Sequence, residues 1–235
     1  MNEASNLLEE LSFEDRKAIY SHAEEHTFRV GSILLRPGES VDYCFFPLGS
    51  AIGAFLVSLE GNQAVETTLV GREGAIGGVV SQGKNPAFAK AIVVGKGSFL
   101  RIAVEDLDRA KAGSPAIADL FARYADCMMA QVFQSIGCNA AHSIEQRTAK
   151  WLIAALERTG QSDIAMTQEQ LASMMGIGRS YASRVVQRFK HDGLLRTRRG
   201  GIVVLDSDGL ESRACDCNGK VRRHFDTVLA GVYPD

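Results

Sequence analysis

The sequence predicts an α+β protein with an N-terminal antiparallel β-barrel or jelly roll, a long helix and a C-terminal winged helix-turn-helix domain. Short strand-like runs separated by glycine turns occupy roughly residues 27–104. A helical period replaces the strand pattern after Ser114-Pro115. A helix, a glycine turn, a second helix and a basic hairpin then follow between Met166 and Leu205.

The composition is that of an ordinary globular protein. The 235 residues are 46% hydrophobic and 23% charged, which is enough material for one or two domains. The start of the chain is acidic and lacks a signal-peptide core, and no apolar run reaches membrane-spanning length. We therefore expect a cytoplasmic protein with no membrane partner. In that compartment the five cysteines are expected to be reduced thiols.

The first half of the chain carries the signals of the barrel. A helix is expected at 9–25, with Ser12 as a plausible cap, and a short helix at 105–111. Glu60-Gly61-Asn62 is typical of a hairpin turn between two strands. The expected strands are 28–36, 43–47, 51–59, 63–70, 87–94 and 99–104.

A long helix begins at Ser114-Pro115, because proline is favoured at the first helical position. Its apolar stripe extends to Ile136 and is wide, so we expect it to pack both on the barrel and on a second copy of the chain. Asn139-Ala140-Ala141 is expected to be a hinge. The predicted division is 1–112 for the barrel, 113–139 for the dimerisation helix and hinge, and 140–235 for the C-terminal domain. The residues expected at the dimer interface are Ile117, Phe121, Tyr124, Met128 and Val132.

The helix-turn-helix follows from local spacing. Thr167 and Gln170 have capping-box spacing at the start of a short helix, and Gly176-Ile177-Gly178 supplies the turn. In the second helix one side is apolar and the other polar and basic. The apolar side consists of Ala182, Val185, Val186 and Phe189.

Positive charge is concentrated here. Seven Arg or Lys residues and one acid lie between Arg179 and Gly200, although the whole chain has a formal net charge of −2. A basic patch on an otherwise acidic protein is typical of a surface that binds a polyanion. The simpler alternative, a solvated helix face, does not explain why turn, basic helix and basic hairpin occur together.

The order of barrel, long helix, hinge and winged helix-turn-helix resembles the Crp/Fnr family of bacterial transcription regulators over nearly the whole chain. The strongest local similarity is Gly178 to Val185, followed by Phe189 and Gly193-Leu194-Leu195, which looks like the family's recognition helix. Asp42 to Gly78 looks like its effector barrel. The tail from Cys215 to Pro234 is similar to tails of one subgroup.

The resemblance and the position of the second helix imply contacts to double-stranded DNA. Arg179, Ser180 and Arg184 are expected to reach base edges. Contacts to the phosphate backbone are expected from the wing and from the rest of the motif. These backbone residues are Thr167, Gly178, Tyr181, Ser183, Arg188, Arg196, Arg198 and Arg199.

The sequence departs from the family pattern in the barrel. Members that bind cyclic AMP carry a glutamate and an arginine, where this chain has Gly77-Gly78 and Ala87-Phe88. Without the arginine, a phosphate loses its bidentate partner. These four residues are the candidate pocket for an unidentified small-molecule effector, unless the barrel serves only as a structural platform. No cysteine precedes Cys44, so the iron–sulfur cluster of the family's oxygen sensors cannot be assembled there.

No enzymatic or metal site emerges from the sequence. No histidine lies between His26 and His142, whereas a metalloenzyme barrel needs clustered ligands on its strands. Cys215, Cys217 and His224 provide only three ligands, with spacing that is poor for a closed zinc site. We therefore predict no catalytic residue, no metal and no cofactor.

We predict that the protein is a transcription regulator that binds a palindromic DNA operator as a homodimer. We expect that cyclic AMP does not control it. RNA polymerase is a further candidate partner. The alternative is a ligand- or redox-sensing signalling protein whose helix-turn-helix serves protein interaction. The basic wing argues against that alternative, because its charge suits a polyanion.

Overall fold

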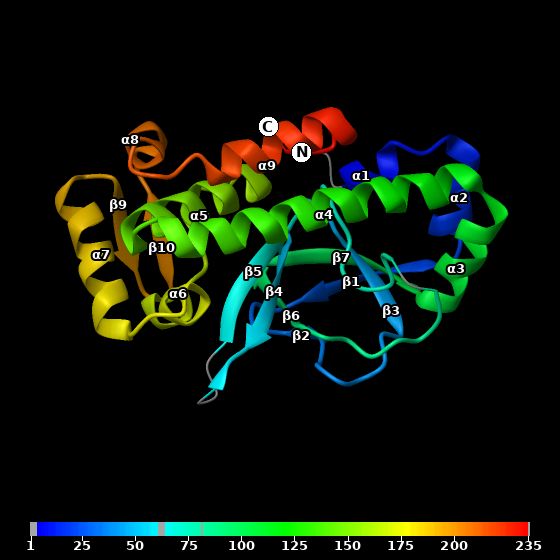
Figure 1. The fold of residues 1–235 in the computed structure, drawn as a ribbon, viewed down its shortest axis with the longest axis horizontal. Coiled ribbons are helices and arrows are strands. Elements are labelled where there is room, and N and C mark those ends of the chain that lie inside the picture. The colour runs from blue at the N-terminus through cyan, green and yellow to red at the C-terminus, as the bar shows by residue number, and fades with distance from the viewer. Residues whose placement is uncertain (1–3, 61–63, 81, 235) are drawn as a thin grey trace.

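The computed structural model describes residues 4–60, 64–80 and 82–234 (Figure 1). Two short helices precede the barrel, and its strands form two antiparallel sheets, ordered β1-β7-β3 and β2-β6-β4-β5. The predicted antiparallel barrel is confirmed. Its elements are α1 (Asn6–Glu9), α2 (Phe13–Tyr20), β1 (Ala23–Phe28), β2 (Ile33–Leu35), β3 (Tyr43–Pro47), β4 (Ile52–Ser58), β5 (Ala64–Val70), β6 (Lys90–Gly95) and β7 (Gly97–Ala103).

Two expected boundaries in this region are corrected. The helix expected over 9–25 is shorter than predicted. Ser12 accepts a hydrogen bond from the Asp15 N–H and starts α2 there, α2 ends at Tyr20, and residues 23–25 belong to strand β1. The strand expected over 28–36 is interrupted by a turn in which Gly31 has a φ of 87°. The expected hairpin turn includes Gly61 and Asn62, which lie outside the described residues.

The helix α3 (Val104–Gly113) leads into α4 (Pro115–Ala141), which runs along most of the length of the molecule, past the barrel and up to the helix-turn-helix (Figure 1). Ser114 caps α4 by accepting the N–H of Ile117. The helix continues through Asn139, Ala140 and Ala141, so the chain does not leave the helix at the expected hinge. The chain instead becomes extended at His142 and Ser143, where Ser143 caps the next helix.

The C-terminal part has the predicted winged helix-turn-helix, with a sheet ordered β8-β10-β9. The last helix, α9, lies beside α4 and brings the C-terminus next to the N-terminus, where Asn6 Nδ2 donates to the Val232 carbonyl at 3.0 Å (Figure 1). Its elements are α5 (Ile144–Thr159), β8 (Asp163–Ile164), α6 (Gln168–Met175), α7 (Arg179–His191), β9 (Leu195–Arg198), β10 (Gly201–Val204), α8 (Ser207–Glu211) and α9 (Cys217–Val228).

One hydrophobic core is shared by the barrel and the C-terminal part. Ile52 and Leu69 of the barrel belong to the same buried cluster as Trp151 of α5, Met175 of α6 and Phe189 of α7. Burying a large apolar side chain contributes about 1.5–3 kcal/mol. The shared core therefore gives the helix-turn-helix a stable position against the barrel.

A buried ion pair crosses the same boundary. Arg158 of α5 is 0% exposed and Glu73 of the β5–β6 connection is 2% exposed, with Nε and Oε1 2.7 Å apart. Arg158 also donates to the Tyr233 hydroxyl at 2.8 Å and to the Ala154 carbonyl. Burial is the largest single influence on the pKa of Arg158 and lowers it. The charge and hydrogen bond of Glu73, together with the charges of Tyr233 and Glu157, outweigh burial and raise that pKa above its ordinary value.

None of the helices in the described part of the chain is both long enough and apolar enough to span a membrane.

Candidate nucleic-acid interface

The helix-turn-helix is built by the local signals that the sequence carries. Both bonds of the Thr167–Gln170 capping box are present at the start of α6. Gly176 ends α6 with a φ of 68°, a conformation that favours glycine. One face of α7 is buried against α6 and the wing, which leaves the opposite face in solvent.

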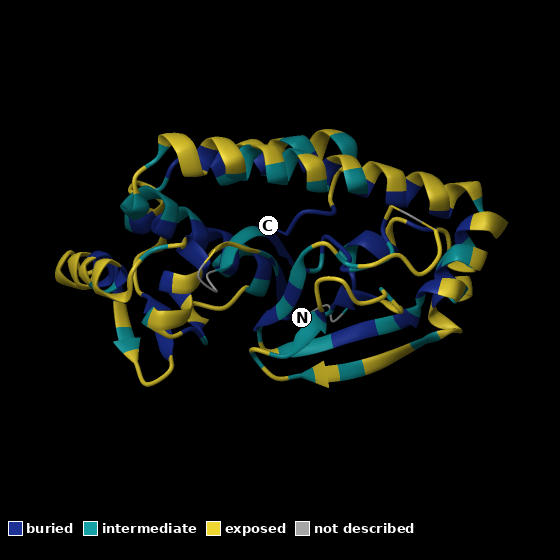
Figure 2. Cartoon of the chain, turned by 60° about the horizontal axis from the view of Figure 1, so that its bottom comes forward, coloured by how far each residue is buried: buried dark blue, intermediate teal, exposed yellow. Residues whose placement is uncertain are grey.

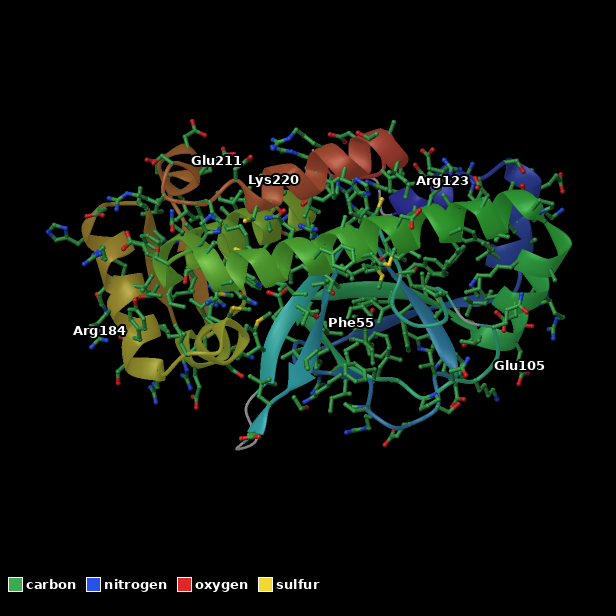
Figure 3. The ribbon with its side chains drawn as sticks, viewed as in Figure 1. Phe55, Glu105, Arg123, Arg184, Glu211 and Lys220 are labelled. Carbon is green, nitrogen blue, oxygen red and sulfur yellow. The ribbon has the colours of Figure 1, made fainter. Side chains whose placement is uncertain are left out.

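The exposed face of α7 carries the predicted base-reading residues. Arg179, Ser180 and Arg184 are all exposed, and Figure 3 shows Arg184 projecting away from the body of the molecule. The Arg184 guanidinium lies 5.2 Å from the centre of the Tyr181 ring, a cation–π contact that keeps it on the outside of the helix. The geometry suits entry of α7 into a groove.

Two predicted backbone arginines are bound to carboxylates of the chain itself. Arg198 of the wing forms a bidentate pair with Asp163 of β8, with its Nε 2.9 Å from both carboxylate oxygens. Arg188 lies 2.7 Å from Glu145 of α5. In the free protein the charges of these two arginines are therefore already paired with carboxylates.

The other arginines of the surface have no such partner. None of them forms an ion pair with a carboxylate in the three stretches that the structure describes. Their charges are exposed and uncompensated, as a site for an anionic ligand requires. These residues are Arg179, Arg184, Arg196 and Arg199.

The remaining predicted backbone residues surround the start of α7. Gly178 is its N-cap and offers no side-chain bond, so the first N–H groups of α7 point outward without a capping side chain. Thr167, Arg179 and Arg198 line a common cleft of about 400 Å³ between α6 and the wing. Ser183 is half-buried, which limits what its hydroxyl can reach.

The predicted dimer residues are corrected in part. Ile117, Phe121 and Tyr124 are at most 1% exposed because they pack on the chain's own barrel, and Tyr124 donates to the Ala75 carbonyl. Met128 and Val132 line the barrel cavity described next. Ile117, Phe121 and Tyr124 are therefore covered by the chain itself, whereas Met128 and Val132 are only half-buried and remain candidates for the dimer interface.

Three apolar side chains of α4 are exposed: Ile136, which belongs to the expected stripe, and Met129 and Phe133, which the sequence did not single out. Met129, Phe133 and Ile136 are 51%, 66% and 63% exposed. Their spacing of four and three residues places them on one face. Figure 2 shows how α4 alternates between exposed and buried segments along its length. The helical period of the sequence indicates that α4 has apolar faces. Which of these faces stays exposed becomes clear only from the way the barrel packs on the helix.

The four candidate effector residues line one cavity. Gly77, Gly78, Ala87 and Phe88 surround a space of about 430 Å³ between the barrel and α4. Phe55 of β4, labelled in Figure 3, is another lining residue, and the remainder are mostly apolar. None of the described lining residues is charged. The cavity suits an uncharged apolar molecule better than a phosphate.

The barrel touches the helix-turn-helix at its turn. A Cβ added to Gly176 would lie 2.7 Å from Cγ2 of Val65, at the start of β5. Other residues of the same hairpin, Phe55 and Thr67, line the cavity. One hairpin therefore contacts both the candidate effector cavity and the turn that holds α7.

Residues 146–213 match the Crp-like helix-turn-helix domain family. The whole fold is similar to FixK2 from Bradyrhizobium japonicum, with 14% identity, a TM-score of 0.68, and coverage of 82% of this chain and 98% of that one. It is also similar to TTHA1359, a Crp/Fnr-family transcriptional regulator from Thermus thermophilus, with 20% identity, a TM-score of 0.64, and coverage of 81% and 98%. TTHB099, a Crp-family regulator from the same organism, has 16% identity, a TM-score of 0.67, and coverage of 80% and 96%. No curated protein sequence matches the chain.

The chain thus combines a β-barrel and a long helix with a Crp-like helix-turn-helix domain. Residues 146–213 belong to the Crp-like helix-turn-helix family, and the chain as a whole has the fold of the Crp/Fnr regulators that it matches. The two matched Thermus thermophilus proteins are transcriptional regulators by their descriptions.

The contact between Gly176 and Val65 leads to a stability prediction. Gly160 ends α5 in the same left-handed conformation, with a φ of 62°, but an added Cβ there would meet nothing within 4 Å. Gly160→Ala should therefore cost only the backbone penalty of roughly 1–2 kcal/mol. Gly176→Ala should cost more, because the methyl group also displaces Val65.

Chemical denaturation of both variants measures the difference. The excess cost of Gly176→Ala should disappear in a Val65→Ala background, as a double-mutant cycle reports. Equal costs for the two glycine substitutions in the wild-type background would show that the barrel does not press on the turn.

Proposed function

We propose that this protein is a sequence-specific regulator that binds a palindromic site in double-stranded DNA as a homodimer. The observation that carries the proposal is the exposed face of α7, which presents Arg179, Ser180 and Arg184 with no carboxylate partner for either arginine among the described residues. An exposed arginine near the start of a recognition helix can bond bidentately to guanine O6 and N7.

The wing supplies contacts of a different kind. Arg196 and Arg199 lie on the β9–β10 hairpin, beside α7 and not on it. Together with the first N–H groups of α7 they are suited to phosphates, which position a protein on DNA without reading its sequence. The side chain of Arg198 joins this group only if DNA displaces its bond to Asp163.

The dimer is proposed to form through α4. Met129, Phe133 and Ile136 form an apolar stripe on a helix that otherwise covers the barrel. A second copy packed along this stripe would remove it from water and place the two α7 helices on one face of the assembly. Two recognition helices would then enter successive major grooves about 34 Å apart.

The barrel is proposed either to bind an uncharged ligand or to serve only as a structural platform. In neither case does it respond to cyclic AMP. The uncharged lining of the cavity has no cation to bind a cyclic phosphate. Contact with RNA polymerase, the other partner considered from the sequence, stays a prediction.

The DNA proposal is tested by comparing Arg184→Ala with Arg199→Ala. Arg184→Ala should weaken binding to the operator by about 1–3 kcal/mol, roughly 5- to 150-fold, and relax the preference at one base pair of each half-site. Arg199→Ala should weaken operator and scrambled duplexes alike and reduce the salt dependence by about one unit. Titrations at several salt concentrations separate the two classes of contact.

An equal loss on both duplexes for Arg184→Ala would refute its role as a base reader. Failure of the wild-type protein to bind any duplex at moderate salt would instead favour the alternative of a helix-turn-helix that serves protein interaction.

The dimer proposal predicts that Phe133→Glu gives a monomer at micromolar concentration, because a charge in the centre of the stripe must be desolvated on association. Sedimentation velocity measures this, and loss of operator affinity should accompany it. Phe13→Glu is the control, since Phe13 is 72% exposed on α2 and lies outside the stripe. A wild-type protein that sediments as a monomer, free and on DNA, would contradict the proposal.

Cyclic AMP should produce no binding heat in calorimetric titration of the folded protein, because the cavity offers its phosphate no charged partner. A micromolar dissociation constant would show that this interpretation of the cavity is wrong.

A further inference from the structure

Four potential metal ligands from two distant parts of the chain meet at the end of α4. Cys138 lies in the last turn of α4, and His142 is the residue directly after the helix, whose N–H donates to the Cys138 carbonyl at 3.1 Å. Cys215 lies between α8 and α9, and Cys217 is the first residue of α9. One ligand atom from each residue falls within 4.8 Å of all the others.

Two distances within this group are close to those of a tetrahedral zinc site. The Sγ atoms of Cys138 and Cys215 are 3.6 Å apart, and Sγ of Cys217 is 3.5 Å from Nδ1 of His142. Zinc–sulfur bonds of about 2.3 Å and zinc–nitrogen bonds of about 2.0–2.1 Å place two ligands of a tetrahedron about 3.8 Å apart for S···S and about 3.5 Å for S···N. The side chains therefore already stand near the corners that one ion requires.

The surroundings also suit thiolate ligands. Gln134 Nε2 donates to Sγ of Cys217 at 3.1 Å, a bond to a ligand atom that orients it and stabilises its negative charge. Lys150 is close enough for its positive charge to act on Cys138. Three thiolates and one imidazole around Zn²⁺ carry a net charge of −1, which Lys150 would partly offset. The three cysteines are buried and His142 is half-buried, so the group lies mostly within the protein and reaches solvent only at the histidine.

Other occupants fit less well. A four-iron cluster binds each ligand to a different iron and needs ligand atoms further apart than 4.8 Å. A disulfide between Cys138 and Cys215 would use two of the four residues and leave Cys217, His142 and Gln134 without a purpose. Thiolate and imidazole together favour zinc over hard cations such as Mg²⁺ and Ca²⁺.

We propose that Cys138, His142, Cys215 and Cys217 bind one zinc ion per chain. This departs from the expectation of no metal, which considered Cys215 and Cys217 with His224. His224 is not part of the group. The available sequence signal was the spacing of Cys138 and His142 at the end of a predicted helix, but nothing in the sequence shows that this turn meets the tail.

The ion would join the end of α4 to the segment between α8 and α9, directly beside the extended residues where the chain enters α5. The position of the C-terminal part relative to α4 would then depend on the metal. The inference is independent of DNA binding, and its test needs no DNA.

The test measures metal in the full-length protein purified without chelators. Elemental analysis should find one zinc per chain, and a chelator that removes it should lower the Tm. Exchange for Co²⁺ should produce the intense visible absorption of a tetrahedral thiolate site.

Matched variants assign the ligands. Cys138→Ala should lose the zinc, whereas Cys127→Ala, which changes an equally buried cysteine of the same helix, should keep it. His142→Ala changes a residue outside the hydrophobic core and covers the case in which Cys138→Ala does not fold. Absence of zinc and of a cobalt spectrum in the wild-type protein would overturn the proposal, as would full zinc content in both Cys138→Ala and His142→Ala.

Discussion

The buried pair of Arg158 and Glu73 is the constraint on which the arrangement of this molecule depends. A charge without its partner at such a site costs about 3–5 kcal/mol, so the two residues must be brought together when the chain folds. Glu73 also accepts the N–H of Gly71, and Arg158 also holds the Tyr233 hydroxyl. The barrel, α5 and the C-terminal tail are therefore positioned by one set of bonds.

The position of α7 follows from that arrangement. The core shared by barrel and C-terminal part packs α5, α6 and α7 against β4 and β5, and Val65 limits the space at the turn beside Gly176. The hairpin that makes this contact also lines the cavity of about 430 Å³. A ligand that moved the hairpin would act directly on the turn before α7, so the fold contains a short physical route from the candidate effector cavity to the proposed DNA surface.

Local features were predictable from the sequence, and long-range ones were not. The capping box of Thr167, the turn at Gly176 and the exposed arginines of α7 depend on residues a few positions apart, and the structure has all of them. The faces of α4 could not be assigned, because an apolar stripe does not say whether barrel or partner covers it. Phe121 proved to be buried in the chain itself and Phe133 exposed. The pair of Arg158 with Glu73, the bond of Arg198 to Asp163 and the group around Cys138 join residues 35 to 85 positions apart. No local pattern indicates such contacts.

The central claim is that α7 reads a specific DNA sequence as part of a symmetric dimer. The most direct measurement is a genome-wide map of the DNA that the protein binds in the cell, made beside that of the Arg184→Ala variant. The account predicts a palindromic motif whose half-sites are centred about 10 base pairs, or one helical turn, apart. It also predicts that this motif degrades at one position per half-site in the variant. A map without an enriched motif, or with an identical motif in the variant, would contradict it.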